Sequence, residues 1–255
     1  MTQIPEQTAD PRLNCALVVG ASGGIGEAVL RRLLHETAYD RVLAVSRQPC
    51  PWELQDRYSE RLSWLQCSYD ESSIARFCET IDTSALDLRR VIICNGVLHG
   101  DNFSPEKNLE SLSGKALHEV FEANAVVPVL WLQQLLRQVR RCQGCKIAIL
   151  SARVGSIGDN ALGGWYAYRS SKAALNMLLK TAAIEYRRRA PGVKLVAFHP
   201  GTTDTALSAP FQRGVPEGKL FSPDFVAERL LALLDNVPDN GELSFLDWDG
   251  KPVPW

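Results

Sequence analysis

The chain has 255 residues, of which 45% are hydrophobic and 22% are charged, a balance that argues against disordered, collagen-like and coiled-coil proteins. Its 28 basic and 29 acidic residues give a formal net charge of −1, so there is no basic excess to hold a nucleic-acid backbone. No apolar run approaches the roughly 20 residues of a membrane helix, and the first residues lack a signal-peptide pattern. We therefore expect a soluble, cytoplasmic protein that binds neither nucleic acid nor membrane.

Short apolar runs alternate with helical patterns from end to end. The predicted strands are residues 15–19, 41–45, 62–65, 91–94, 146–150, 194–198 and 243–246. The predicted helices are residues 25–36, 71–81, 115–141, 166–189 and 223–234. Buried strands separated by helices are typical of a Rossmann-type, doubly wound parallel α/β sheet, here of about seven strands. No linker or repeat interrupts this pattern, so residues 1–255 are predicted to form a single domain.

Two segments do not follow the regular pattern. Pro128 lies inside the helix predicted over 115–141, where it should kink the helix or remove one hydrogen bond. Residues 206–221 form the longest stretch without periodicity, and loops of this length are typically functional lids or disordered segments.

Seven cysteines, an odd number, favour reduced thiols in a reducing compartment. Cys142 and Cys145 form a CxxC motif, which a redox pair or half of a zinc site would use. Because neither a second CxxC nor a pair of histidines lies near it, we interpret the motif as a polar turn before a strand and expect no metal.

A glycine-rich turn, GASGGIG at residues 20–26, joins the first predicted strand to the first helix. Glycines let the backbone approach a pyrophosphate, and the helix N-terminus offers free N–H groups and partial positive charge. The alternative is a helix-capping turn with nothing bound. The predicted dinucleotide-binding residues in this turn are Gly20, Ser22, Gly23, Gly24, Ile25 and Gly26.

The end of the second strand indicates which dinucleotide binds. An acidic residue there would accept hydrogen bonds from the ribose hydroxyls and repel a 2′-phosphate. The sequence instead has Ser46 and Arg47, and a guanidinium makes charge-assisted contacts with phosphate. NADP(H) is therefore predicted over NAD(H), unless Arg47 is only a solvated surface charge.

Tyr168 and Lys172 lie four residues apart at the start of a predicted helix, so they share one helix face. A nearby ammonium favours tyrosinate and lowers the tyrosine pKa, which makes Tyr168 a candidate general acid for a carbonyl oxygen. The pair follows the fifth strand, whose carboxyl end is where an open α/β sheet places its site. Tyr166 is a competing acid, but no lysine follows it by four residues.

Together these motifs resemble the short-chain dehydrogenase/reductase family over nearly the whole chain. The matching segments are GASGGIG at 20–26, Asn124, YRSSK at 168–172 and PGTTDT at 200–205. Residues 151–157, 163–168 and 249–255 resemble the branch that includes sniffer-type carbonyl reductases and bacterial C-factor-like proteins.

The resemblance implies a role for each residue. Tyr168 would protonate the carbonyl oxygen, Lys172 would bind the nicotinamide ribose and lower the Tyr168 pKa, and Asn124 would hold a water that reaches Lys172. NADPH would deliver the hydride. The remaining cofactor contacts would come from Asn95, Gly96, Pro200, Gly201, Thr203 and Thr205.

Two positions depart from the family pattern. The family usually has a catalytic serine three residues before a glycine, where this chain has Ala152 before Gly155. Ser151 or Ser156 would have to replace it, and we favour Ser151 although adjacent strand residues face opposite sides. The second departure is ICNG at residues 93–96 in place of Asn-Asn-Ala-Gly, for which Asn95 is expected to compensate.

Two functions remain open from the sequence. One is an NADPH-dependent carbonyl reductase, acting on a small ketone, aldehyde or quinone or in the reverse direction. The other is a cofactor-binding signalling protein with little catalysis, suggested by Ala152 and the C-factor-like resemblance. His99 is a candidate for the substrate pocket. Family members commonly pair through long helices, so a homodimer or homotetramer is expected, with Trp131, Leu132, Met177 and Leu178 either at the interface or in the core.

Overall fold

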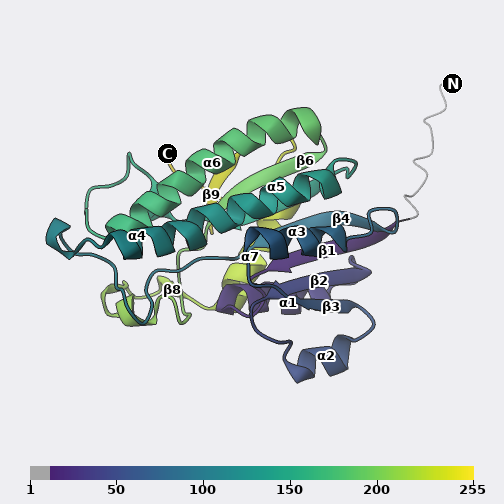
Figure 1. The fold of residues 1–255 in the computed structure, drawn as a ribbon, viewed down its shortest axis with the longest axis horizontal. Coiled ribbons are helices and arrows are strands. Elements are labelled where there is room, and N and C mark those ends of the chain that lie inside the picture. Colours follow the sequence, from purple (N-terminus) through teal and green to yellow (C-terminus); the bar gives the residue numbers. More distant parts are fainter. Residues whose placement is uncertain (1–11) are drawn as a thin grey trace.

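The structure, a computed structural model, describes residues 12–255. Within these residues seven strands form one parallel sheet in the order β3-β2-β1-β4-β5-β6-β9 (Figure 1). The strands are β1 (Leu13–Val19), β2 (Arg41–Ser46), β3 (Leu62–Gln66), β4 (Leu86–Ile93), β5 (Cys145–Leu150), β6 (Val193–His199) and β9 (Ser244–Asp247). The predicted fold class is confirmed. The domain predicted over 1–255 includes residues 1–11, which lie outside the described residues.

Helices cover both faces of the sheet (Figure 1). They are α1 (Gly24–His35), α2 (Trp52–Tyr58), α3 (Glu71–Glu79), α4 (Gly114–Phe121), α5 (Val127–Val139), α6 (Tyr166–Arg189) and α7 (Pro223–Asn236). Buried side chains of α3, α5 and α6 share one hydrophobic core with the sheet, and those of α1, α2 and α7 share the other. This two-sided burial explains why the strand sequences are continuously apolar.

Strand β1 shows how one apolar run serves both cores. Cys15, Leu17 and Val19 contribute to the core beneath α5 and α6, whereas Ala16 and Val18 contribute to the core beneath α1 and α7. All five are fully buried. Because successive side chains of a strand face opposite sides, both faces must be hydrophobic when both are covered.

Three elements differ from the sequence-based prediction. Helix α2 was not expected, and β4 begins at Leu86 rather than at residue 91, with the charged Asp87 buried at its start. A second, two-stranded sheet pairs β7 (Thr202–Thr203) with β8 (Leu220–Phe221). This small sheet brings together the two ends of the predicted lid segment. The segment contains a 3₁₀ helix over Ala209–Gly214.

Pro128 removes a hydrogen bond rather than breaking the long helix. Helix α4 continues through a π-helical turn, Glu122–Val126, into α5. In that turn the Val127 N–H reaches back to the Glu122 carbonyl. Proline has no N–H and cannot continue the ordinary ladder, and a single wide turn before it accommodates the loss. The same turn holds Asn124, so the irregularity lies at a predicted site residue.

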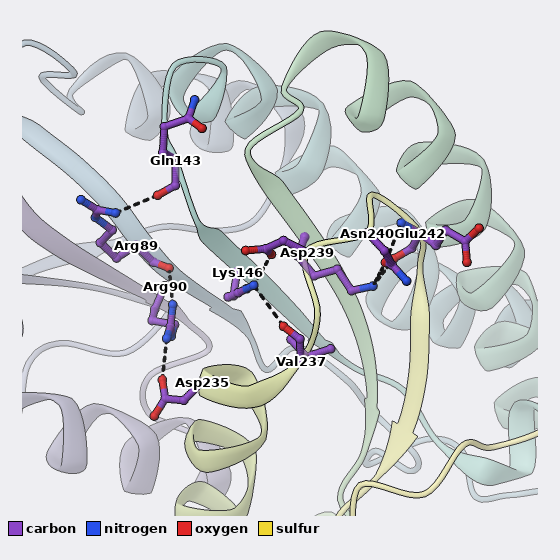
Figure 2. Close-up of polar contacts among 10 residues, drawn as sticks. Arg89, Arg90, Gln143, Lys146, Asp235, Val237, Asp239, Asn240 and Glu242 are labelled. Carbon is purple, nitrogen blue, oxygen red and sulfur yellow. Dashed lines mark hydrogen bonds and ion pairs between the residues drawn. The ribbon is translucent and has the colours of Figure 1, made fainter. Parts of the chain in front are cut away.

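At the amino-terminal edge of the sheet, three cations stand side by side. Arg90, Lys146 and Lys194 are register partners on β4, β5 and β6. The last turn of α7 and the segment that joins α7 to β9 supply their acceptors, as Figure 2 shows for Asp235 with Arg90 and for Asp239 and Val237 with Lys146. Lys194 Nζ donates to Asn240 Oδ1 (2.6 Å) and to the Glu242 carbonyl (2.5 Å). In-register like charges repel, and this segment compensates them.

None of the helices within residues 12–255 combines the length and the hydropathy needed to cross a membrane.

Candidate functional site

The glycine-rich turn lies at the carboxyl end of β1 and allows no side chains at its closest approaches. A Cβ on Gly26 would lie 2.2 Å from the Gly20 carbonyl oxygen, and one on Gly24 would lie 2.7 Å from Thr205 Cγ2. Gly20 itself has a φ of 80°, in the left-handed region. Gly23 precedes α1 without a side-chain cap, so the first N–H groups of the helix remain available to an anion. Ser22 is exposed and Ile25 half-buried in the same turn.

The end of β2 is tied to this turn by two serines. Ser46, fully buried, donates from its hydroxyl to Ser22 Oγ (2.6 Å) and accepts from the Gln48 N–H (2.9 Å). Arg47 lies next to them on a cavity of about 490 Å³ that Asn95 and Gly96 also line. The predicted phosphate-binding residues and the predicted ribose-side residues therefore border the same space.

Tyr69, which the sequence analysis missed, is hydrogen-bonded to the glycine-rich turn. Its hydroxyl accepts from the Gly20 N–H (3.1 Å) and donates to the Val45 carbonyl (3.2 Å). The Arg47 guanidinium lies 5.9 Å from the centre of its ring, within the range of a cation–π contact. Tyr69 has a φ of 70°, and burial raises its pKa to about 12. Only the unusual tyrosine in the turn after β3 could have drawn attention to it.

Asn124 connects the end of β4 to helix α6. Its Oδ1 accepts from the Val97 N–H (2.7 Å), and its Nδ2 donates to the Val97 carbonyl (2.9 Å) and to Ser171 Oγ (3.0 Å). A Cβ on Gly96 would lie 3.3 Å from Asn124 Oδ1 and 3.5 Å from Lys172 Nζ. Asn124 is fully buried, so these bonds fix the backbone that passes Lys172.

Tyr168 and Lys172 lie on one face of α6, as their spacing predicts. Lys172 Nζ lies 6.0 Å from the centre of the Tyr168 ring and donates to the Leu150 carbonyl at the end of β5 (2.8 Å). Burial lowers the pKa of Lys172 to about 8 and raises the pKa of Tyr168 to about 12. The lowered Tyr168 pKa expected from the ammonium is not found, because desolvation of the phenol raises that pKa instead. Tyr168 therefore holds its proton at neutral pH.

The two candidate replacements for the missing serine both have protein partners. Ser151 donates from its hydroxyl to Asn176 Oδ1 on α6 (2.6 Å), and Ser156 accepts from the Asp159 N–H (3.1 Å). Both are at least 97% buried. Within the described residues neither hydroxyl is hydrogen-bonded to Tyr168, and each would have to exchange its present bond to reach a substrate.

The segment after β6 brings the last predicted residues to the glycine-rich turn. Pro200 and Gly201 follow β6, and Gly201 has a φ of 74° with the Phe221 ring packed against its Cα. Thr203, in β7, is buried with its hydroxyl oxygen unpartnered among the described residues. Thr205 touches Gly24 at the start of α1. The segment after β6 thus lies against the start of α1.

Aromatic rings surround Tyr168 on the lid side. The Trp165 ring stands edge-on to Tyr168, with 6.2 Å between centroids, and to Phe211 of the lid, with 5.2 Å. His99 contacts the same Phe211 ring (5.8 Å), and its Nε2 lies 3.2 Å from the Ala206 carbonyl oxygen. His99 therefore lies beside the lid. Tyr166, the competing acid, is the first residue of α6.

Two further predictions concern residues outside this site. Cys142 and Cys145 are free and buried, and burial raises the pKa of the Cys142 thiol to about 11 and that of Cys145 well above its ordinary value. Such thiols are poorly reactive, which agrees with a structural turn. Of the two alternatives left open for Trp131 and Leu132, the structure shows the core one, whereas Met177 is 67% exposed.

The family model described as short chain dehydrogenase matches residues 14–215. The chain therefore belongs to the short-chain dehydrogenase family, as its motifs indicated.

Characterised relatives cover most of the chain at modest identity. The 1-hydroxy-2-glutathionyl-2-methyl-3-butene dehydrogenase of Rhodococcus sp. strain AD45 is 26% identical over 95% of this chain and 100% of its own length. C-signal of Myxococcus xanthus is 33% identical over 53% of this chain and 76% of its own length. The NADPH-bound carbonyl reductase from chicken fatty liver superposes with a TM-score of 0.79, at 26% identity, over 96% of this chain and 100% of that one. The predicted resemblance to C-factor-like proteins and carbonyl reductases is confirmed.

Proposed function

We propose that this oxidoreductase reduces a ketone, aldehyde or quinone to an alcohol with NADPH, and that Tyr168 is the general acid. The observation that carries this proposal is the convergence of Tyr168, Lys172 and Asn124 at the carboxyl edge of the sheet, beside the glycine-rich turn. The carboxyl edge of an open parallel sheet is the expected place for such chemistry.

The residues at this edge fit NADP(H). The glycine-rich turn leaves room where a Cβ would collide with backbone, and α1 offers uncapped N–H groups to the diphosphate. Ser46 and Arg47 suit a 2′-phosphate, while Asn95 and Gly96 border the ribose side. When bound, NADPH supplies the hydride that reduces the carbonyl carbon. Gly201, Thr203 and Thr205 are proposed to line the nicotinamide, with Pro200 setting the turn.

Tyr168 is proposed to donate its phenolic proton to the carbonyl oxygen as charge develops there. Its pKa of about 12 keeps the proton in place until it is needed, and Lys172, with a pKa of about 8, is still largely charged at neutral pH. That ammonium would stabilise the tyrosinate and bind the nicotinamide ribose. Asn124 holds the neighbouring backbone for a proton relay to Lys172. Ser151 remains the proposed substrate-binding hydroxyl, once it exchanges its bond to Asn176.

The test compares two tyrosines two residues apart on α6. Tyr168→Phe should lower kcat at least about a hundredfold on every carbonyl in a panel of ketones, aldehydes and quinones, because the general acid is lost. Tyr166→Phe is the matched control and should retain activity. Turnover is followed by NADPH absorbance, and NADPH and NADH binding by fluorescence titration. Full turnover by Tyr168→Phe, or loss only in Tyr166→Phe, would sink the proposed mechanism.

A second candidate function is a cofactor-binding signalling protein with little catalysis. The similarity to C-signal and the alanine at position 152 favour it. The same panel distinguishes the two: NADPH binding without oxidation by any carbonyl supports the signalling function, and rapid oxidation contradicts it.

We also propose a homodimer or homotetramer and a cytoplasmic location. The exposed Met177 and Ile184 on α6 support self-association, and the seven free cysteines suit a reducing compartment. Light scattering on the purified protein measures the assembly directly.

A further inference from the structure

The helix that carries Tyr168 begins without a cap of its own. Trp165 occupies the N-cap position of α6 and makes no side-chain capping bond. Its φ is 52°, and Gly163 and Gly164 before it each have a φ of 65°. Glycine tolerates this left-handed backbone, but a bulky aromatic residue does so only when its surroundings hold it there.

Glu106 supplies the missing cap from a distant segment between β4 and α4. Its Oε2 accepts from the Ala167 N–H (3.2 Å) in the first turn of α6, across a separation of 61 residues. Its backbone carbonyl accepts from the Trp165 N–H (2.5 Å). One residue thus accepts from two N–H groups at the start of the helix, that of the N-cap residue and one in the first turn.

The Glu106 carboxylate is unusual in its burial. The residue is only 4% exposed, and no ion pair within residues 12–255 includes it. Burying a carboxylate without a cation is costly, but the partial positive charge of a helix N-terminus compensates for part of that cost. The α6 N-terminus is therefore what keeps Glu106 in place, and Glu106 in turn fixes that N-terminus.

A second contact holds the other side of the same turn. Arg169 Nε donates to the Gly163 carbonyl (3.1 Å) and the Gly164 carbonyl (3.0 Å). Glu106 accepts from the Trp165 and Ala167 N–H groups, which lie just after these carbonyls in the chain. With both sets of backbone groups engaged, the Trp165 ring is directed onto Tyr168 and Phe211.

We propose that Glu106 is a positioning residue for the proton-donating tyrosine: it caps α6 and holds Trp165 left-handed, so that the indole fixes the Tyr168 ring against the lid. This inference rests on the proposed role of Tyr168. Tyr168 is the third residue of the capped helix, and small displacements of a reacting group cost rate steeply.

The experiment replaces the carboxylate in two ways. Glu106→Ala removes the acceptor and should lower kcat at least about tenfold, because Tyr168 is no longer held. The expected Kd for NADPH, measured by fluorescence titration, stays within about twofold. Glu106→Gln keeps an oxygen for the Ala167 N–H and should recover at least about half of the wild-type kcat. Glu106→Asp, one methylene shorter, replaces the alanine variant if that protein does not fold.

The matched control is Ser113→Ala, which removes the N-cap of α4, a helix that does not carry the tyrosine. It should lower Tm without changing kcat. The proposal is overturned if Glu106→Ala keeps its kcat, if it weakens NADPH binding as much as it lowers kcat, or if Glu106→Gln is as poor as Glu106→Ala. If the Glu106 variants keep the wild-type kcat while Tyr168→Phe is inactive, this inference alone is overturned. If Tyr168→Phe is active, the proposed function is overturned.

Discussion

Lysine side chains are buried at both ends of the central sheet, but the two ends give them different numbers of hydrogen-bond acceptors. At the carboxyl end Lys172 is 2% exposed and donates to one protein acceptor among the described residues, the Leu150 carbonyl. At the amino end Lys146 and Lys194, 6% and 1% exposed, each have two acceptors from the segment between α7 and β9. An ammonium has three donors.

This difference distinguishes the structural role of the lysines at the amino end from the functional role proposed for Lys172. Lys146 and Lys194 each donate hydrogen bonds to oxygens on the segment between α7 and β9. These bonds hold that segment against the sheet, as Figure 2 shows for Lys146. Within residues 12–255 Lys172 has donors that no second protein acceptor takes, beside Tyr168 and Asn124. A buried cation with too few acceptors costs stability, and such groups are retained at sites where another molecule uses them.

The largest expected effect is at Lys172. Lys172→Met keeps much of the aliphatic volume but removes the charge, and kcat should fall at least about a hundredfold because the tyrosinate loses its ammonium. Stability should not fall with it, and urea unfolding at pH 7 measures this. Because burial lowers the Lys172 pKa from 10.5 to about 8, removing the charge should stabilise the fold by up to about 3 kcal/mol. A variant that is both inactive and unstable would contradict this assignment.

The pH dependence of stability tests the same lysine without relying on activity. Below pH 8 Lys172 is protonated in both states, but between pH 8 and its unfolded value of 10.5 the unfolded chain binds more protons. Stability of the wild type should therefore rise with pH relative to that of Lys172→Met in this window. The buried thiols of Cys15, Cys78 and Cys142, whose raised pKa values oppose this rise above pH 9.0, act equally in both proteins. Tyr168 opposes this only above pH 10, because its folded pKa is raised to about 12.

Urea unfolding of the wild type and Lys172→Met from pH 7 to 10 measures this window. Lys194, whose pKa burial also lowers, is present in both proteins, so the difference between the two curves isolates Lys172. Parallel curves would show that burial of Lys172 does not shift its titration.

The sequence predicted the parts of this architecture that have local causes. Helix α6 follows its predicted bounds, and the glycine-rich turn lies between β1 and α1, because apolar periodicity and glycine placement act over a few residues. The roles of Tyr69 and Glu106 were not predictable. Each meets its partners only when segments 49 or 61 residues apart come together, and neither has a sequence pattern of its own.

The smallest expected effect is at the amino end of the sheet. Lys194→Met removes charge-assisted bonds to Asn240 and Glu242, each typically about 1.5–3 kcal/mol, but it also removes the cost of burying a cation beside Lys146. Because the two effects oppose each other, we expect a net loss of about 1 kcal/mol in urea unfolding.

The same variant should keep its kcat and its affinity for NADPH, because the amino end of the sheet lies away from Tyr168. Lys115→Met, an exposed lysine on α4, is the matched control and should change stability by less than about 0.5 kcal/mol. A loss of kcat in Lys194→Met at unchanged stability would show that the two ends of the sheet are coupled, and the division between a fastening end and a reactive end would fail. Unchanged kcat with reduced stability fixes the role of the α7–β9 segment as the clamp on those cations.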